Sequence, residues 1–278
     1  MCGIVGVLKS ESTDSHAHAL RLLKHLEYRG YDSFGYLSED FVPHKSVGAI
    51  SKADVRIPEK ASHTTIAHTR WATHGKVNIQ NTHPHISFHD KFAIVHNGVI
   101  SNAKDLRKSL QSQGCKFYGD TDTEVLVNII EQEYISYPDR EPRDIISDAL
   151  ASVEGEYALV IMSKSWPDTL VCVKKESPLV LGLSKNLCVI ASDEVALAED
   201  FATCWHLQDG EIITVKRTRH GIHISDMQTS EVSEISNDTH TSGSPEDFPD
   251  FMSKEMSEIP DVLNKANFVK IYDVLPEE

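Results

Sequence analysis

The second residue of the chain, Cys2, offers chemistry that an internal cysteine does not. It follows the initiator Met1 directly. Removal of Met1 leaves a thiol and a free α-amine on one residue, and an amine with an ordinary pKa of about 7.7–8.0 is a suitable base for that thiol. Arg29 is a candidate cation to favour the thiolate, unless it is only a solvated charge at a helix end. Cys2 is therefore a candidate nucleophile, although most single cysteines are plain buried or surface thiols.

A second group of polar residues follows a predicted strand at 64–68. The segment Ala-His-Thr-Arg-Trp-Ala-Thr-His-Gly places Arg70, Trp71, Thr73 and His74 in one loop. The Arg70 guanidinium suits a carboxylate because its planar fork pairs with two oxygens, and Thr73 and His74 are placed to complete that site. A surface salt bridge for Arg70 and a half-buried Trp71 are the structural alternative.

Two further segments have both a structural and a functional interpretation. Asn97-Gly98 between apolar runs is typical of a hairpin turn, but the Asn97 amide and the Gly98 N–H are also suitable donors to an oxyanion. Thr121-x-x-Glu124 fits a helix capping box with Asp122 in the first turn. The Asp122 carboxylate is equally able to bind the ammonium group of a ligand.

Hydrophobic periodicity predicts the elements that position these residues. Apolar runs predict strands at 3–8, 64–68, 92–96, 157–162, 169–173, 179–183, 187–191 and 211–215. Helical spacing of apolar residues predicts helices ending near 27 and at 103–113, 122–134 and 143–153. Two runs of strands separated by helices indicate sheets covered by helices rather than alternating β-α units. The predicted fold class is therefore α+β in layers.

Composition indicates which kinds of partner, cellular location and bound ion to expect. The 278 residues carry 42 acidic and 27 basic side chains, and the basic ones are scattered, so we expect neither a nucleic-acid nor a membrane partner. There is no apolar run of about 18–20 residues and no secretory signal, which favours a cytoplasmic location. We expect no cofactor and no metal: the five cysteines form no C-x-x-C pair, and His83-Pro84-His85 lacks acidic or cysteine partners at ligand spacing.

Six motifs in this order resemble those of the class II glutamine amidotransferases, which belong to the N-terminal nucleophile hydrolases. They lie at 2–6, 27–33, 68–75, 81–85, 96–98 and 121–124. Within that class, Tyr-Arg-Gly-Tyr-Asp-Ser and His-Thr-Arg-Trp-Ala-Thr-His-Gly are most similar to the glutaminase domain of glutamine–fructose-6-phosphate aminotransferases. The likeness covers roughly residues 2–216. Residues 251–256 resemble the start of the connection to a sugar-isomerase half, which we expect to be absent here.

The resemblance implies a four-layer αββα sandwich and an enzyme activity. The implied reaction hydrolyses L-glutamine to glutamate and ammonia through a glutamyl thioester on Cys2. By the same resemblance, the α-amine of Cys2 is the general base, Asn97 and Gly98 form the oxyanion hole, and Arg29 supports the nucleophile.

The resemblance also implies how glutamine is held. It assigns the α-carboxylate to Arg70, Thr73 and His74, and the α-ammonium group to Asp122. Trp71 is assigned to a loop that closes over the substrate. Glutamine presents one carboxylate, one ammonium group and one amide, and the chain offers a partner for each.

The expected domain organisation has three parts. Residues 2–225 form the glutaminase domain, 226–250 a flexible polar segment rich in Ser, Thr, Asp, Glu and Pro, and 251–278 a tail that begins with an amphipathic piece. Released ammonia is lost to water without an acceptor, so we expect a partner, either an acceptor subunit or a sugar-isomerase domain protein. The alternatives are a glutamine-sensing regulatory module without catalysis and an ammonia donor to a different acceptor.

Overall fold

The computed structural model describes residues 2–55, 57–58, 60–72, 75–225, 231–235, 248–249 and 251–265. The chain divides into two compact units, Met1–Gly243 and Ser244–Glu278. The first unit contains two β-sheets and helices α1 to α4. The second contains helix α5 (Phe251–Lys265).

The first sheet is antiparallel, and its described strands follow the order β14-β11-β9-β10-β1-β4-β2-β3. Because β1 pairs with β10 on one side and β4 on the other, the chain start is anchored in the middle of the sheet. The strands are β1 (Gly3–Thr13), β2 (Ser33–Ser38), β3 (His44–Val47), β4 (Ser62–Arg70), β9 (Val180–Leu183), β10 (Leu187–Ala191), β11 (Thr203–His206) and β14 (Glu231–Glu234).

The second sheet is also antiparallel, with the order β13-β12-β8-β7-β6-β5 among the described strands. Its longest pairing joins β6 and β7, which run side by side over nine residue pairs. The strands are β5 (His85–Ile86), β6 (Phe92–Ile100), β7 (Gly155–Ser163), β8 (Thr169–Lys175), β12 (Ile212–Thr218) and β13 (Gly221–Ser225).

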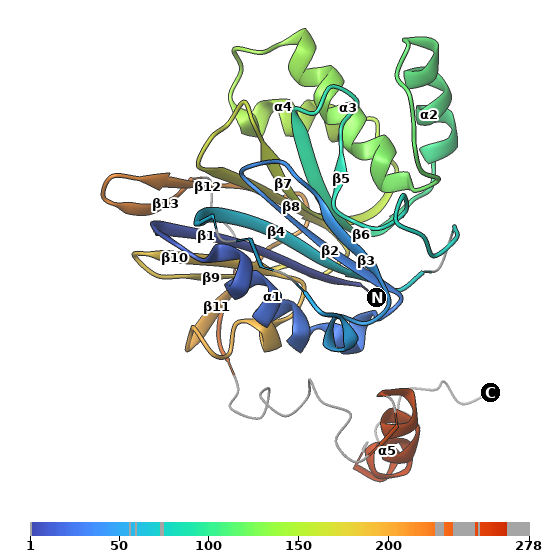
Figure 1. Ribbon diagram of the computed structural model, residues 1–278, viewed down its shortest axis with the longest axis vertical. Helices are drawn as coiled ribbons and strands as arrows, with labels where there is room; N and C mark the ends of the chain where they lie inside the picture. The colour runs from blue at the N-terminus through green and yellow to red at the C-terminus, as the bar shows by residue number, and fades with distance from the viewer. Residues whose placement is uncertain are drawn as a thin grey trace, which may run out of the picture. The chain divides into compact units, whose positions relative to one another are not determined.

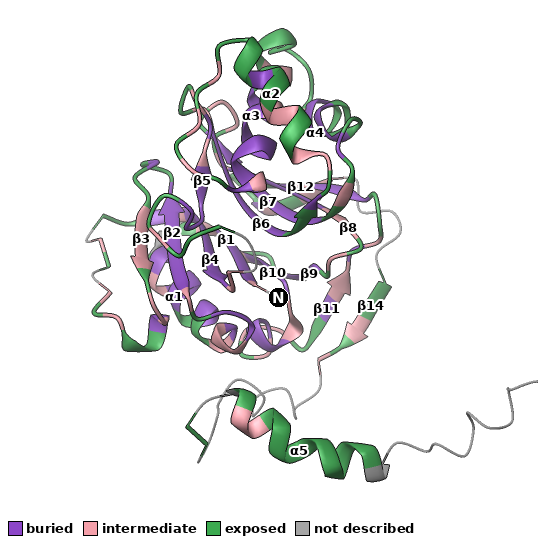
Figure 2. Ribbon diagram, turned by 90° about the vertical axis from the view of Figure 1, so that its right-hand side faces the viewer, coloured by how far each residue is buried: buried purple, intermediate pink, exposed green. Residues whose placement is uncertain are grey.

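Three buried apolar clusters hold the first unit together in four layers. Successive residues of a strand face opposite sides, so Ile4 packs between the two sheets while Val5 packs against α1 (Ser15–His25). On the far side of the second sheet, Ile94 packs against Leu126 and its neighbours on the outer helices. Figures 1 and 2 show helices outside both sheets and buried residues between them. These outer helices are α2 (Ala103–Ser112), α3 (Asp122–Ser136) and α4 (Pro142–Leu150).

The layered α+β prediction is confirmed, and each predicted strand and helix has a counterpart. The hairpin interpretation of Asn97-Gly98 is wrong, because both residues lie inside β6, opposite Ala158 and Tyr157 of β7. Pairing with β7 overrides the local turn preference of the Asn-Gly pair. The strands that periodicity did not predict are β2, β3, β5, β11, β13 and β14.

The segment predicted to be flexible, 226–250, contains one of these strands. β14 pairs with β11, with Ser233 opposite Cys204. A short polar strand has no hydrophobic alternation to reveal it, and its order comes from pairing with a distant strand. Residues 226–230, 236–247 and 250 lie outside the described residues.

Helix α5 of the second unit carries exposed apolar side chains. Along α5, Met252, Met256 and Ile259 are exposed, and Pro260 lies inside the helix.

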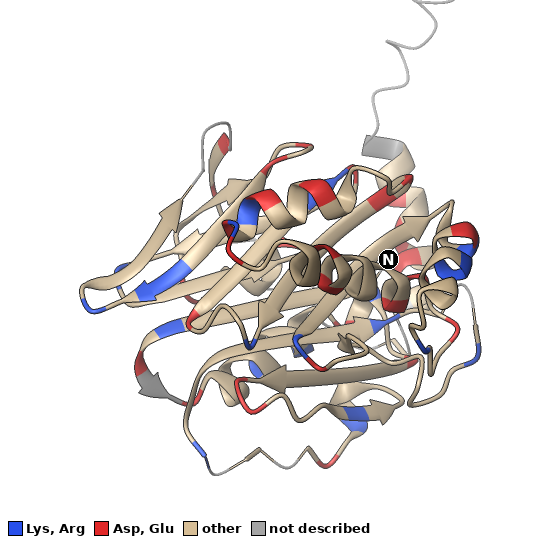
Figure 3. Ribbon diagram, turned by 90° about the horizontal axis from the view of Figure 1, so that it is seen from above, with Lys and Arg blue, Asp and Glu red and all other residues tan. Residues whose placement is uncertain are grey.

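Figure 3 shows Lys and Arg spread over several separate elements, with Asp and Glu between them. Among the helices that the structure describes, none is long and apolar enough to cross a membrane.

Candidate active site

Cys2 immediately precedes β1, where the backbone is closely packed. The Gly3 N–H donates a hydrogen bond to Thr69 Oγ1 at 3.1 Å. A Cβ atom on Gly3 would lie 2.6 Å from Thr69 Oγ1 and 2.7 Å from the Cβ of Leu26. Position 3 therefore requires glycine, and the tight packing holds the half-buried Cys2 in place.

The sulfur of Cys2 contacts the main chain of the loop that follows β4. Its Sγ accepts a hydrogen bond from the Trp71 N–H at 3.2 Å and lies 3.7 Å from the Trp71 carbonyl oxygen. Burial raises the pKa of the Cys2 thiol, and the Trp71 N–H and the charges of Arg70 and Arg29 oppose this only in part. A thiol with a raised pKa is mostly protonated at neutral pH, so attack by this sulfur requires a base.

Arg29 contacts the main chain of Cys2. Its Nε donates to the Cys2 carbonyl oxygen at 3.2 Å, and its Nη1 forms a 2.7 Å ion pair with Asp193 Oδ2. The same Asp193 oxygen accepts from the Tyr28 hydroxyl at 2.7 Å. Burial and the bond to Asp193 raise the pKa of Tyr28 to about 12, so this hydroxyl remains a donor. The arrangement orients residue 2 and places a cation near its sulfur.

Asn97 reaches Cys2 from β6 in the other sheet. Its Nδ2 donates to the Cys2 carbonyl oxygen at 2.7 Å, and its Oδ1 lies 3.1 Å from Nε2 of the buried His68. His68 thereby fixes which way the amide group points. Gly98 follows with a φ of +134°, and a Cβ atom there would lie 2.0 Å from the carbonyl oxygen of Glu156. Both the backbone conformation and the close approach of β7 require glycine at this position.

A cavity of about 370 Å³ opens beside Cys2. Its size falls within the usual range for small-molecule sites. The predicted site residues that line it are Cys2, Arg70, Trp71, Gly98 and Asp122. The wall also includes Lys104 and Arg107 from α2, which sequence reasoning did not select. Arg29 and Asn97 contact Cys2 through its carbonyl oxygen, as described above.

Arg70 is the last residue of β4, and Trp71 begins the loop that follows it. The Arg70 side chain is buried, with Nη1 donating to the Lys76 carbonyl oxygen at 3.2 Å. Asp32 supports the loop, because its N–H donates to the Arg70 carbonyl oxygen and its carboxylate accepts from the Ala72 N–H at 2.8 Å. Trp71 packs edge-on against Tyr31. Thr73 and His74, predicted to bind the same ligand group as Arg70, lie outside the described residues.

Asp122 is the first residue of α3 and lines the cavity. Thr121 is the N-cap, as predicted, and its Oγ1 accepts from the Glu124 N–H. In a capping box the Glu124 carboxylate would accept from the N–H of Thr121. Here it accepts instead from the N–H groups of residues 118 and 119. The Asp122 carboxylate accepts from the N–H groups of Ile100 and Thr123, which fixes its position at the cavity wall.

Four buried histidines, of which His83 and His96 line the cavity, form a cluster that sequence reasoning missed. The rings of His68 and His83 stack at 4.0 Å, and His85 meets His83 edge-on. His83 Nε2 and His96 Nδ1 each lie 2.9 Å from the Thr123 hydroxyl. One hydroxyl proton serves only one acceptor, so at least one ring must donate to Thr123. Burial lowers the pKa of each histidine, to about 3 for His68, and keeps the cluster neutral.

Comparisons with known proteins find a matching domain family, similar sequences and a similar fold. Residues 68–199 match the family described as "Glutamine amidotransferase domain". The chain is 34% identical over 277 residues to the glutamine–fructose-6-phosphate aminotransferase of Thermotoga maritima and 36% identical over 275 residues to that of Pseudomonas putida. Each alignment covers 96% of this chain and 44% of the relative.

The chain contains a class II glutamine amidotransferase domain. The chain spans less than half the length of these curated relatives. Its fold matches the glutamine phosphoribosylpyrophosphate amidotransferase of B. subtilis with a TM-score of 0.67, at 24% identity, over 82% of this chain and 50% of that one. A structure titled as the allosteric regulatory enzyme of purine biosynthesis gives the same TM-score at 25% identity, over 82% of this chain and 49% of that one. The sandwich of this amidotransferase domain is therefore of the N-terminal nucleophile hydrolase type.

Proposed function

We propose that this chain hydrolyses L-glutamine to glutamate and ammonia through a thioester on Cys2. The observation that carries the proposal is the cavity, whose wall combines a thiol, the Arg70 guanidinium and the Asp122 carboxylate. The thiol can attack the side-chain amide of glutamine, the guanidinium can pair with its α-carboxylate, and the Asp122 carboxylate can pair with its α-ammonium group. Thr73 and His74 are proposed to assist Arg70, and Trp71 to close over the bound substrate.

In the proposed mechanism, removal of Met1 frees the α-amine of Cys2, which takes the thiol proton. The thiolate attacks the amide carbon, and the resulting oxyanion accepts hydrogen bonds from Asn97 Nδ2 and the Gly98 N–H. Nδ2 has two N–H groups, one for the Cys2 carbonyl and one for the oxyanion. The ammonium form of the amine returns its proton to the departing nitrogen, and ammonia leaves.

The second half of the mechanism uses the same groups. Water attacks the thioester carbon while the α-amine accepts its proton, a second oxyanion forms at Asn97 and Gly98, and glutamate leaves as the thiol is restored. Arg29 is proposed to hold the backbone of residue 2 throughout, since its Nε bonds to the Cys2 carbonyl oxygen.

The ammonia acceptor is proposed from the names of the relatives. Those proteins are glutamine–fructose-6-phosphate aminotransferases, so we propose that ammonia released here is used to form glucosamine-6-phosphate, on a sugar-isomerase domain in a longer chain or a separate subunit. In this view residues 2–225 are the glutaminase domain, 226–250 a connecting segment, and 251–278 the beginning of the link to the acceptor part. The cytoplasmic location stays a prediction.

Glutamate release from glutamine tests the activity. We expect the chain, with removal of Met1 verified by intact mass, to release glutamate, and Cys2→Ala to release none. Cys115→Ala is the matched control, because Cys115 is also half-buried but does not line the cavity, and it should keep the parent rate. An equal rate in Cys2→Ala contradicts the mechanism. Tight glutamine binding by a trimmed chain that releases no glutamate would favour the sensing alternative.

A further inference from the structure

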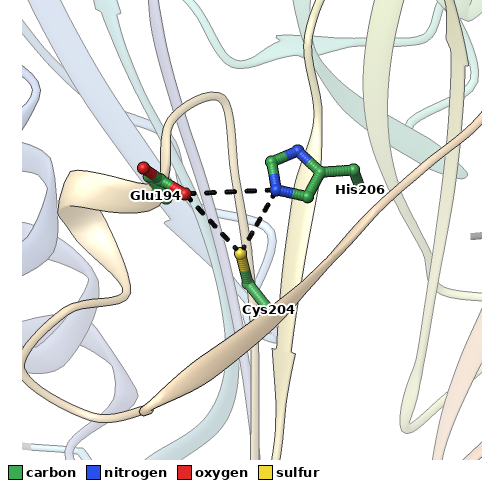
Figure 4. A group of neighbouring side chains, drawn as sticks. All are labelled: Glu194, Cys204 and His206. Atoms are coloured by element: carbon green, nitrogen blue, oxygen red, sulfur yellow. Dashed lines mark hydrogen bonds and ion pairs between the residues drawn. The ribbon is translucent and has the colours of Figure 1, made fainter. Parts of the chain in front are cut away.

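A group of potential metal ligands lies outside the active site, at the β14 end of the first sheet. Cys204 and His206 are two residues apart on β11, so their side chains share one face of the strand. Glu194 belongs to the short 3-10 helix η3 (Glu194–Ala196). Figure 4 shows the Glu194 carboxylate, the Cys204 sulfur and the His206 ring pointing toward one another.

The distances among these three groups are close to those of a coordination sphere. Cys204 Sγ lies 3.6 Å from His206 Nε2 and 3.9 Å from Glu194 Oε2, and the nitrogen and the oxygen are 4.0 Å apart. Tetrahedral zinc, with bonds of about 2.3 Å to sulfur and about 2.0–2.2 Å to nitrogen and oxygen, separates its ligand atoms by about 3.4–3.6 Å. A small movement of the Glu194 side chain is enough to complete that geometry.

A fourth donor comes from the neighbouring strand β14. Ser233 is opposite Cys204 in the ladder, and its Oγ lies 3.4 Å from Cys204 Sγ and 2.8 Å from His206 Nε2. The hydroxyl is therefore on the same side of the sheet as the three ligand atoms. It can occupy the fourth position itself or donate a hydrogen bond to a water molecule there.

The chemistry of the donors selects one class of ion. A thiolate, an imidazole and a carboxylate match Zn²⁺, whereas Ca²⁺ and Mg²⁺ prefer oxygen ligands throughout. The thiolate and the carboxylate together carry two negative charges, which a divalent cation neutralises. Cys204 is fully buried while Glu194 and His206 are partly exposed, so an ion reaches the site from solvent and meets its sulfur ligand on the inner side.

We propose that Glu194, Cys204 and His206 bind a thiophilic divalent cation of the Zn²⁺ class, with Ser233 or water at the fourth position. The ion joins η3, β11 and β14, and so fixes a polar edge strand that has little apolar surface to hold it. The sequence spacing did not indicate this site, because Cys-x-His with a distant glutamate is not a familiar ligand pattern. The proposal is independent of glutamine hydrolysis.

Zinc binding to the full chain tests the proposal. The Cys2→Ala background is used, because the thiol and α-amine of Cys2 form a chelating pair of their own. We expect equilibrium dialysis against Zn²⁺ to give one ion per chain and thermal unfolding to move upward with Zn²⁺. Co²⁺ in place of Zn²⁺ should give the sulfur-to-metal charge-transfer band of a thiolate ligand.

Ligand variants with matched controls assign the site. Cys204→Ser and His206→Gln should each weaken Zn²⁺ binding at least tenfold, while Cys115→Ser and His220→Gln keep the parent affinity. His206 is partly exposed, so its variant is informative even if Cys204→Ser does not fold. The proposal is overturned if the chain binds no Zn²⁺, or if His206→Gln binds it as tightly as its parent.

Discussion

At the scale of single residues, Cys2 is held by its main chain while its sulfur faces the cavity. Arg29 and Asn97 donate to its carbonyl oxygen, and Thr69 accepts from the next N–H group. These side chains come from three separate segments. Such support matters because a displacement of about 1 Å at a reacting group can lower a rate by about 10²-fold.

Asn97 provides a test of the oxyanion proposal. We expect Asn97→Ala to lower kcat for glutamine hydrolysis by about 10²–10³ with a smaller change in KM, since a donor to the transition state is lost. Steady-state kinetics measure both constants. Alkylation of Cys2 by iodoacetamide is the control, because it needs the thiol but no oxyanion donor. If alkylation slows by the same factor as kcat, Asn97 acts only by positioning Cys2.

At the scale of elements, β6 carries the site because it continues through Asn97 and Gly98 instead of turning. Gly98 has a positive φ, and β7 approaches so closely that there is no room for a Cβ atom. The same strand contributes His96, which belongs to the histidine cluster and lines the cavity. One strand therefore brings His96, Asn97 and Gly98 to a single site.

The conformation of Gly98 predicts a difference between two glycine variants. Gly114 also has a positive φ, but no atom lies within 4 Å of the position that a Cβ atom would take. Gly114→Ala should therefore cost only about 1 kcal/mol of unfolding free energy. Gly98→Ala should cost about 1–3 kcal/mol more, because β6 and β7 must also separate. Urea unfolding of the two variants measures the difference. Equal losses would mean that the close approach of β7 is easily relieved.

At the scale of the whole molecule, the histidine cluster lies where the two sheets meet beside the cavity. His68 belongs to β4 in the first sheet, and His85 and His96 belong to β5 and β6 in the second. His68 Nε2 also lies 3.0 Å from the carbonyl oxygen of His96, which joins the sheets directly. Since burial lowers the pKa of each of these histidines, folding keeps them unprotonated at pH values where the unfolded chain protonates them.

The cluster therefore predicts a loss of stability in mild acid. Below the ordinary histidine pKa of about 6.5 the unfolded chain binds more protons than the folded one, so each buried histidine lowers the unfolding free energy by on the order of 1 kcal/mol per pH unit. For His68 this window extends down to its folded pKa of about 3. Urea unfolding at pH 7 and pH 5 measures the loss.

Two histidine variants separate the cluster from the carboxylates that also titrate in acid. His85→Gln should lose less unfolding free energy between pH 7 and pH 5 than the parent, because one buried titrating group is removed. His220→Gln, at an exposed turn, should lose the same amount as the parent. An identical loss in His85→Gln would contradict the assignment of the pH dependence to the buried rings.

Local patterns in the sequence determined most of the elements and the motifs of the site. Alternating or continuous apolar runs predicted the central strands, and helical spacing predicted α1 to α4, because these periods follow from the geometry of the backbone itself. The strands β2, β3, β5, β11, β13 and β14 were not predicted. For β11 and β14 the reason is that these four-residue strands pair with each other across a long stretch of chain, with Cys204 opposite Ser233, which no local period records.

The sequence also indicated some of the residues that form the site. Cys2, Arg70, Asn97 and Asp122 stand in motifs whose residue types match the chemistry of glutamine, and their neighbours supplied the family resemblance. Only the tertiary structure showed that Arg29 pairs with Asp193, 164 residues away in sequence. It also showed that the four histidines form one buried cluster. Contacts of this kind depend on how two sheets are paired and stacked, so they are decided by the packing of the whole chain and not by the spacing of residues along it.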